Sequence, residues 1–341
     1  MTSIATLVRL NAFAFVCHLI SGVLGVILAK QSNPAVYAYA PLVEFSSNTT
    51  AGVFTPTPKQ IFKTGAFTGL ILFAFITAGF HIIYIMILLS PSLDAFIRRR
   101  LVDSSSLMPL RWVEYGITAT IISAWGQLSI GNDSFYFFLT MLTSGFSFQF
   151  FGLLLEKLDC FNKKDRNIAE VIWNIASLIN ISPVAILLYQ LFASRTHNQQ
   201  IFIYNIAPYA LWFQSFGVIA WLTFIRYHQF KDRAFSEKWY LVLSLSTKLT
   251  IFWLGFSTFR EISVKQGWVA ATPGVDWYRV RMTAAYLPFG LVFFVALNDA
   301  MDWWRQNPTV VNAPVRQYIL EEEPVTRRSR SQRPALREFS L

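Results

Sequence analysis

The sequence predicts an all-α membrane protein, in which seven transmembrane helices form a bundle and an eighth transmembrane helix follows near the C-terminus. Composition is the first reason: 54% of the 341 residues are hydrophobic and 14% are charged, whereas soluble domains carry about 25% charged residues. The second reason is that the apolar residues gather into separate runs, which approach or exceed the roughly 20 residues that a helix needs to cross a bilayer. The third is that basic residues fall in short loops between the runs and in the tail.

Eight apolar runs give the expected helices in chain order. The first seven are Leu10–Ala29, Gly65–Leu89, Trp112–Ile130, Phe135–Leu155, Ile168–Ala193, Ile201–Ile225 and Trp239–Phe259. The eighth is Met282–Leu297. The first run is expected to be a retained helix and not a cleaved signal peptide, because Ile27 stands where cleavage after Ala29 would need a small residue.

Composition also divides the chain into three parts. Residues 1–262 contain the seven-helix bundle, residues 263–306 contain a linker and the eighth helix, and residues 307–341 form an arginine-rich tail that is expected to be disordered. The long connection Lys30–Phe62 has aromatic residues alternating around Val36–Phe45. This alternation predicts a short β-hairpin between the first two helices.

The charge of the loops predicts the orientation of the bundle. The loops after the second, fourth and sixth runs are basic, whereas those after the third and fifth contain a single basic residue, Arg195. The basic side chains are Arg98, Arg99, Arg100, Arg111, Lys157, Lys163, Lys164, Arg166, Arg226, Lys231, Arg233 and Lys238. Because cytoplasmic loops are rich in Lys and Arg, the N-terminus is expected in the cytoplasm, and the eighth helix returns the tail to the same side. The net charge of +10 therefore fits attraction to anionic lipid headgroups better than binding to nucleic acid.

Lys248 is the most informative residue of the chain, since its apolar run, Trp239–Phe259, contains no other charge. At 1.5 Å per helical residue, Lys248 lies about 14 Å from the start of the run and about 18 Å from Arg260. That depth is too great for the side chain to reach the interface fully. A charge at bilayer depth is costly and marks a functional site. A lone buried lysine suits a Schiff base to a carbonyl cofactor.

A buried positive charge on Lys248 needs an opposite charge nearby. Glu114, near the start of the third run, is the candidate counterion, although it can instead pair with Arg111 three residues before it. Ser244 lies four residues before Lys248, on the same face of the expected helix, where its hydroxyl can hydrogen-bond the nitrogen or a water molecule. The serine can equally bond its own helix backbone.

Two histidines, His18 and His81, lie deep in the first and second runs. With Ser21, Thr77 and Tyr84 at helical spacing, they predict a hydrated polar cavity that can accept a proton, since histidine titrates near neutrality. The alternative is that each histidine is a packing residue whose hydrogen bonds are satisfied. The histidines have no evident third metal ligand, and the two cysteines predict neither a disulfide framework nor a metal site.

Aromatic side chains are dense in the fourth, sixth and seventh runs. They are Phe146, Phe148, Phe150, Phe151, Tyr209, Trp212, Phe213, Phe216, Trp253 and Phe256. This set can surround a polyene, or its members can pack ordinarily against lipid and neighbouring helices.

Several of these residues belong to motifs that resemble the heliorhodopsin family, the microbial-type retinal proteins with inverted membrane topology. The motifs are Arg111-Trp112-Val113-Glu114-Tyr115, Leu243-Ser244-Leu245-Ser246-Thr247-Lys248, His18-Leu19, Phe80-His81, Glu156-Lys157 and Trp212-Phe213-Gln214-Ser215-Phe216. They occur in order over the region Arg9–Phe259. The inverted topology also follows independently from the loop charges.

The resemblance implies a rhodopsin-like bundle, a homodimer, and all-trans retinal on Lys248 with Glu114 as its counterion. The cofactor-binding residues that it implies are Lys248, Glu114, Ser244, Trp212, Phe213, Tyr115, Phe148 and Gln214. The proton-accepting cavity would contain His18, His81, Ser21 and Tyr84. The chain departs from the family by continuing beyond the seventh helix, and by having Ser182-Pro183 where a tryptophan near the retinal ring is expected.

The expected function is light sensing without vectorial pumping, and not enzymatic catalysis. A pump of the wider microbial class resembles a pattern with an aspartate at the position of Ser244, and here the third run offers Thr118 and Ser123 but no second carboxylate. A slow photocycle that holds the proton internally and signals to a cytoplasmic partner is therefore expected. The alternative is a light-gated proton or cation channel. A third interpretation is a retinal-free transporter or lipid enzyme, which no paired carboxylates or nucleophile–base arrangement supports.

Overall fold

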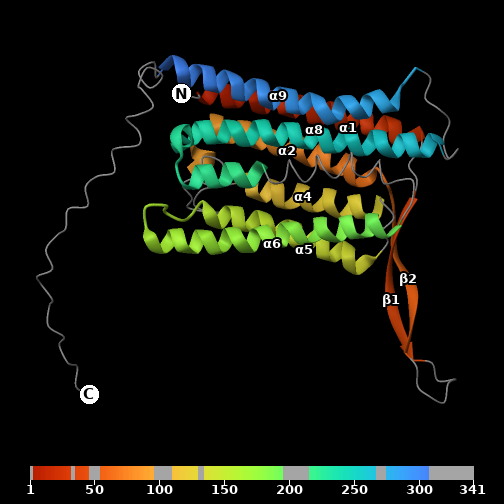
Figure 1. Ribbon diagram of the computed structural model, residues 1–341. Helices are drawn as coiled ribbons and strands as arrows, with labels where there is room; N and C mark the ends of the chain where they lie inside the picture. The colour runs from red at the N-terminus through yellow and green to blue at the C-terminus, as the bar shows by residue number, and fades with distance from the viewer. Residues whose placement is uncertain are drawn as a thin grey trace, which may run out of the picture. The chain divides into compact units, whose positions relative to one another are not determined.

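The computed structural model describes residues 3–31, 35–45, 54–95, 110–129, 134–194, 215–265 and 274–306, which form helices and one β-hairpin (Figure 1). The helices are α1 (Ile4–Gln31), α2 (Thr68–Leu89), α4 (Leu110–Ser129), α5 (Phe135–Leu155), α6 (Lys163–Ser194), η1 (His228–Lys231), α8 (Arg233–Lys265) and α9 (Trp277–Gln306). A further apolar helical segment covers Ser215–Phe224. Among the described helices, α1, α2, α5, α8 and α9 are long and apolar enough to cross a membrane.

The expected helices agree with the structure over most of their length. α5 has the expected bounds, and α2 begins three residues later than the apolar run that predicts it. α8 extends beyond Trp239–Phe259 at both ends, because an apolar run marks the part of a helix in lipid and the helix continues through polar residues on either side. Of the expected helix Ile201–Ile225, residues 201–214 lie outside the described residues, as does the tail after Gln306.

The expected hairpin is confirmed and is longer than its aromatic alternation indicates. β1 (Ala35–Phe45) pairs antiparallel with β2 (Phe54–Gly65), with a shift in register between Ala38 and Tyr39. Ala38 is buried against Leu128 of α4 and Phe138 of α5. The hairpin is therefore anchored where α4 ends and α5 begins.

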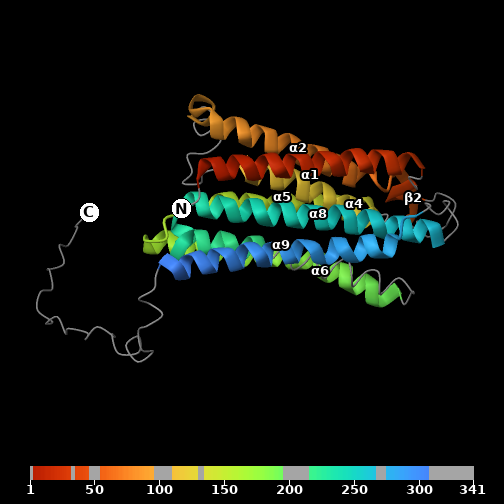
Figure 2. The same cartoon turned by 90° about the horizontal axis from the view of Figure 1, so that it is seen from above.

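α1, α2, α4, α5 and α8 lie side by side along a common direction (Figures 1 and 2). α1 packs on α2 and α8, α2 packs on α4, and α4 and α6 both pack on α5. The central apolar cluster includes Phe67, which stacks on Phe256 of α8 with ring centroids 4.2 Å apart. Gly152 of α5 lets α4 approach closely, because a Cβ atom there would lie 2.2 Å from the ring of Trp112.

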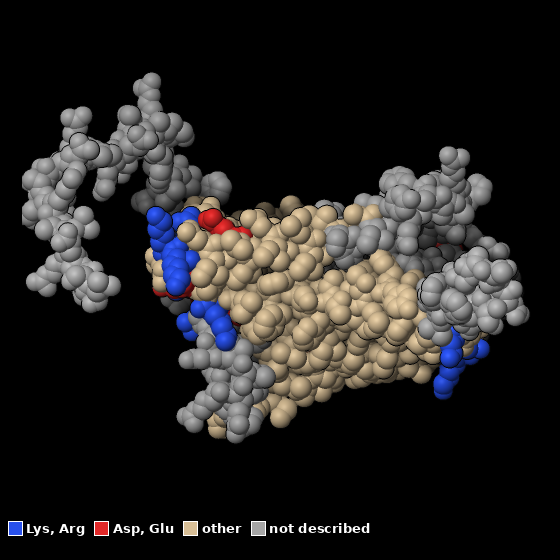
Figure 3. Space-filling model, turned by 90° about the horizontal axis from the view of Figure 1, so that it is seen from below, with Lys and Arg blue, Asp and Glu red and all other residues tan. Residues whose placement is uncertain are grey.

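The surface between the helix ends is apolar. Large hydrophobic side chains such as Phe13, Ile20 and Phe150 are about half exposed. Figure 3 shows one face on which uncharged side chains cover a broad area, with Lys and Arg side chains at its two ends. A surface of this kind suits contact with lipid and not with water. Together with the apolar helices, it identifies an integral helical membrane protein.

The chain divides into two compact units, Met1–Val292 and Phe293–Leu341, and the division falls inside α9. In the first unit, the start of α9 is tied to α8. Trp277 joins the central apolar cluster, and Arg281 forms an ion pair of 2.8 Å with Glu261. The expected eighth run thus forms a helix, which extends well beyond Met282–Leu297 at both ends.

Candidate functional site

Lys248 lies in the middle of α8 and forms an ion pair with Glu114 of α4. The lysine is 5% exposed and the glutamate 1% exposed, so both charges are removed from solvent. α8 can place a charge there because every residue from Trp239 to Lys248 is buried. The structure therefore brings together the lysine and the carboxylate that the sequence singles out, and each compensates the other's loss of hydration.

Both carboxylate oxygens of Glu114 are engaged. Oε1 accepts from the ammonium of Lys248, and Oε2 accepts a hydrogen bond of 2.6 Å from the hydroxyl of Tyr84 on α2. The ammonium also lies 5.1 Å from the ring centroid of Tyr115. Three helices thus fix the pair, and Tyr84 restrains the carboxylate even if the lysine changes its charge.

Glu114 pairs with Lys248, and Arg111 has two other carboxylate partners. Arg111 instead forms ion pairs with Glu156, which caps the end of α5, and with Glu237 near the start of α8. Its guanidinium also lies 3.8 Å from the ring centroid of Tyr240. Because Arg111 begins α4, it lies about one helical turn from Glu114 and faces the ends of the two neighbouring helices. The cluster around Arg111 is therefore separate from the Lys248–Glu114 pair.

The two histidines of the expected polar cavity are adjacent. The rings of His18 on α1 and His81 on α2 are stacked, with centroids 5.6 Å apart and planes 4° from parallel. His81 is also next to Tyr84, with ring centroids 5.9 Å apart. Glu114, Tyr84, His81 and His18 consequently form one continuous line of polar side chains inside the bundle.

Asn11 of α1, which the sequence did not single out, fixes the orientation of His81. Its Nδ2 donates to the carbonyl oxygen of Leu7 at 2.9 Å, so its Oδ1 is the atom that faces Nδ1 of His81 at 2.8 Å. An amide oxygen only accepts, so Nδ1 of His81 must carry the proton. In a neutral imidazole, Nε2 is then a proton acceptor.

Several buried polar atoms around the two histidines have no protein hydrogen-bond partner among the described residues. They are Nδ1 and Nε2 of His18, Nε2 of His81 and Oγ1 of Thr77. Buried polar atoms need a partner, and water molecules commonly supply it. Ser21 is buried but is engaged elsewhere, since it accepts a hydrogen bond of 3.1 Å from Nε1 of Trp253.

Two small cavities, of about 40 and 30 Å³, lie between the helices of the bundle. The first is lined by Lys248 and by apolar or aromatic side chains such as Phe73, Tyr115 and Phe216. The second is lined by Phe148 among others and shares Phe216 with the first. Seating a chromophore as long as retinal would require side chains at this shared wall to move.

The chemistry of these residues fits retinal. An amine that can condense with an aldehyde lies beside a buried carboxylate, and the walls beyond it are apolar and aromatic. Ser244 is buried one turn before Lys248, and the hydroxyl of Tyr115 donates to the carbonyl oxygen of Tyr240 at 3.3 Å. The other three expected cofactor-binding residues, Trp212, Phe213 and Gln214, lie outside the described residues.

Comparison with known proteins agrees with this site. No curated protein matches the chain. The family model of heliorhodopsin matches residues 7–259, which include both histidines, Glu114 and Lys248 and stop before α9. The chain therefore belongs to the heliorhodopsin family of light-sensing, retinal-binding membrane proteins.

Proposed function

We propose that the protein is a light sensor in which Lys248 carries all-trans retinal as a protonated Schiff base and Glu114 is the counterion. The observation that carries this proposal is the buried ion pair between the two residues. When bound, retinal would absorb visible light and isomerise from all-trans to 13-cis. All further steps belong to the protein's own side chains.

The proton at Lys248 has two possible acceptors nearby. Glu114 is in direct contact, and Tyr84 links it to the neutral acceptor Nε2 of His81. Because His81 and His18 are stacked, a proton that reaches one ring can be shared between the pair through water. This arrangement holds a proton close to where it started.

The arrangement does not favour a vectorial pump. Ser244, and not a carboxylate, lies one turn before Lys248, and the hydroxyl of Thr118 is engaged with the carbonyl oxygen of Glu114 at 2.8 Å. Two further acids of the bundle, Glu156 and Glu237, are held by Arg111. We therefore propose a slow photocycle in which the proton returns internally, and the signal passes to a cytoplasmic partner.

The finer topology is part of the same proposal. Seven helices would cross the bilayer with the N-terminus in the cytoplasm, and α9 would be the eighth span, returning the tail to that side. Residues 1–262 would form the retinal-binding domain, residues 263–306 the linker and eighth span, and residues 307–341 the cytoplasmic tail. A homodimer is proposed from family resemblance alone.

The second candidate function is a light-gated proton or cation channel. The line of polar side chains from Glu114 through Tyr84 to His81 and His18 favours it, because the line could fill with water when the pair at Lys248 is disturbed. A channel passes current down the applied gradient, whereas a sensor passes none. The two functions are therefore separated by one electrical measurement.

The deciding experiment is whole-cell voltage clamp under green illumination, on cells supplied with all-trans retinal, with the absorption spectrum of the purified protein as a control. A visible band without photocurrent supports the sensor. A current that reverses with the gradient establishes the channel, and a steady photocurrent at zero voltage and without a gradient contradicts both proposals. The absence of a visible band in folded protein would contradict retinal binding through Lys248.

A further inference from the structure

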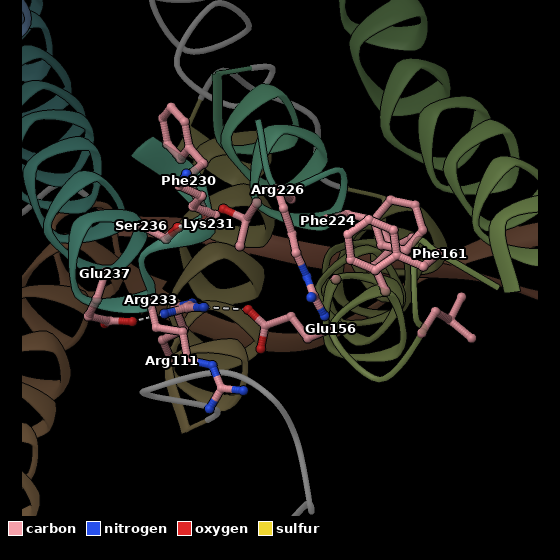
Figure 4. A pocket seen from close by; sticks show the side chains of 15 residues that line it. Arg111, Glu156, Phe161, Phe224, Arg226, Phe230, Lys231, Arg233, Ser236 and Glu237 are labelled. Carbon is pink, nitrogen blue, oxygen red and sulfur yellow. Dashed lines mark hydrogen bonds and ion pairs between the residues drawn. The ribbon is translucent and has the colours of Figure 1, made fainter. Parts of the chain in front are cut away.

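A third cavity, of about 510 Å³, lies at the end of the bundle where α4 and α8 begin and α5 ends (Figure 4). Its volume falls within the range of small-molecule sites, which is about 300–1,000 Å³. It is far larger than the two small cavities, one lined by Lys248 and the other by Phe148. Neither the proposed chromophore site nor the line of histidines uses it.

The charges at the floor of the cavity are paired with one another, and the rim of the cavity is basic. The floor is the cluster in which Arg111 holds Glu156 and Glu237, and the dashed contacts in Figure 4 show the arginine between the two acids. The rim carries the exposed cations Arg226, Lys231 and Arg233. The lining thus contains four basic and two acidic side chains, so the cavity carries an excess positive charge that favours an anion.

The walls beside this rim are aromatic. Phe161, Phe224 and Phe230 line the cavity (Figure 4). The guanidinium of Arg226 lies 4.9 Å from the ring centroid of Phe161 and 3.8 Å from a carboxylate oxygen of Asp159. Because both members of that ion pair are about half exposed, the pair is weak and can exchange for another anion. A ligand that fits these walls has an apolar part beside its charged group.

The backbone at Arg226 provides a separate indication that its side chain is selected. The helical segment before it ends in a Schellman motif, in which Tyr227 N donates to Leu222 O at 3.0 Å and Arg226 N donates to Thr223 O at 3.2 Å. Arg226 occupies the left-handed position of that motif, with φ +53°. Glycine is the usual residue there because it has no Cβ. A large cation at a glycine position is disfavoured by the backbone, so its advantage must come from what its side chain does.

We propose that this cavity is a binding site for a phosphate-bearing amphiphile. Its phosphate would lie among Arg226, Lys231 and Arg233, because guanidinium groups bind phosphate oxygens through paired hydrogen bonds. Its apolar part would contact Phe161, Phe224 and Phe230. The ligand can be an anionic phospholipid of the adjoining leaflet or a soluble phosphate ester, since both present the same chemistry.

Ligand binding at this site could also respond to light and so transmit the signal of the proposed sensor. This extension rests on the proposed function. Arg111 at the floor and Glu114 beside Lys248 are three residues apart on α4, and Tyr240, over which Arg111 lies, accepts the hydrogen bond of Tyr115. A change of charge at Glu114 therefore reaches the floor within one helical turn. If binding of retinal and binding of this ligand are coupled, each changes the affinity for the other by the same factor.

The experiment uses the full chain in phosphatidylcholine nanodiscs. Phenyl phosphate is titrated by calorimetry as the soluble probe, and nanodiscs that also contain phosphatidic acid are analysed by native mass spectrometry for retained lipid. The paired substitution Arg226→Gln and Arg233→Gln is expected to weaken binding by roughly tenfold or more, as expected for loss of charged hydrogen bonds. Binding of one probe and not the other identifies the source of the ligand.

Two comparisons make the proposal falsifiable. Lys163→Gln with Lys164→Gln removes the same charge from the start of α6, outside the cavity lining, and should leave binding unchanged. Equal losses in both double variants would show only diffuse attraction, and failure of both probes to bind would overturn the site. Arg226→Gly should lose affinity while keeping or raising the melting temperature, since it relieves the left-handed backbone. Full affinity in Arg226→Gly would reject the arginine's role.

Measurements without and with retinal distinguish failure of this proposal from failure of the proposed function. Binding is first measured in the retinal-free protein, where it should already be present if the cavity is a site. It is then measured in the retinal-loaded protein in darkness and under light. An equal ligand affinity in darkness and under light would support the cavity as a binding site. It would also show that the cavity does not transmit the light signal. Absence of any pigment would overturn the proposed function, while binding by the retinal-free protein would still support the site.

Discussion

α8 and the first part of α9 are both apolar helices, yet they bury very different parts of their surface. Every residue of α8 from Trp239 to Lys248 is buried. In α9 up to Val292, the buried residues form one stripe, Trp277, Arg281, Ala285 and Pro288, while Tyr286 and Leu287 are 60% and 68% exposed. Hydropathy alone does not distinguish the two helices. A helix surrounded by protein can hold a charged pair inside the bundle. A helix with one buried stripe can only pack on the outside of the bundle.

The largest expected effect is from Lys248→Ala in α8. We predict complete loss of the visible absorption band, because no other amine lies beside Glu114 in the described bundle. The variant should also unfold more easily, by about 3–5 kcal/mol, since it leaves a buried carboxylate uncompensated. Absorption spectroscopy after reconstitution with retinal measures the first effect, and denaturation measures the second.

Lys238→Ala is the matched control for this change, since Lys238 is on the same helix but only partly buried. It should keep the band. A second variant, Lys248→Ala with Glu114→Gln, should recover stability without recovering colour. A visible band in either variant that lacks Lys248 would disprove covalent attachment at that residue.

Glu114→Gln tests whether Glu114 is the counterion of Lys248 on α8. The pigment should form but absorb at longer wavelength, because the amide stabilises the ground-state positive charge less than the carboxylate does. The absorption maximum of the purified pigment measures the shift. An unshifted or blue-shifted maximum would show that another group is the counterion.

Asn11→Leu examines the buried face between α1 and α2, at the far end of the line of polar side chains from Lys248. We predict that His81 loses its fixed Nδ1–H tautomer, because the acceptor that selects it is removed. Nitrogen NMR of labelled histidine distinguishes the tautomers, with or without retinal. Asn298→Leu is a control on α9, where Asn298 makes the same bond to the carbonyl four residues back but in an exposed position. If the His81 tautomer is unchanged in Asn11→Leu, Asn11 does not determine it.

The smallest expected effect on the pigment is from truncation after Lys265, which removes α9. The visible band should persist, because α9 contributes no side chain to the small cavity lined by Lys248 or to the one lined by Phe148. The melting temperature should fall, since losing the buried Trp277 costs about 3 kcal/mol. Loss of colour in a folded truncated protein would show that α9, like α8, helps to form the chromophore site.

The sequence was sufficient to predict those features that depend on position along one helix. The depth of Lys248 in its apolar run, the helix bounds to within several residues and the hairpin around Val36–Phe45 are all of this kind. The Lys248–Glu114 contact was also predicted, because Glu114 was one of few acids inside the runs.

The features that the sequence did not predict depend on which helices face one another. Asn11 and Glu237 carry no local signal, since each is an ordinary polar residue near the end of an apolar run. Arg111 had two possible carboxylate partners from neighbouring helix ends as well as Glu114 on its own helix. Helical spacing favoured Glu114, but packing of α4 against α5 and α8 determined the outcome.

Gly152 occupies a wall common to two compartments of the bundle. It lines the large basic cavity and also the small aromatic cavity that contains Phe148, and the ring of Trp112 fills the space where its side chain would be. Leu155 and Ala220 also line both cavities, so the partition is formed by α5, the segment Ser215–Phe224 and the indole of Trp112. An added methyl group there would push on both compartments at once. For protein engineering, this makes position 152 a poor choice for tuning colour alone, and a direct means of asking whether colour and output can be adjusted separately.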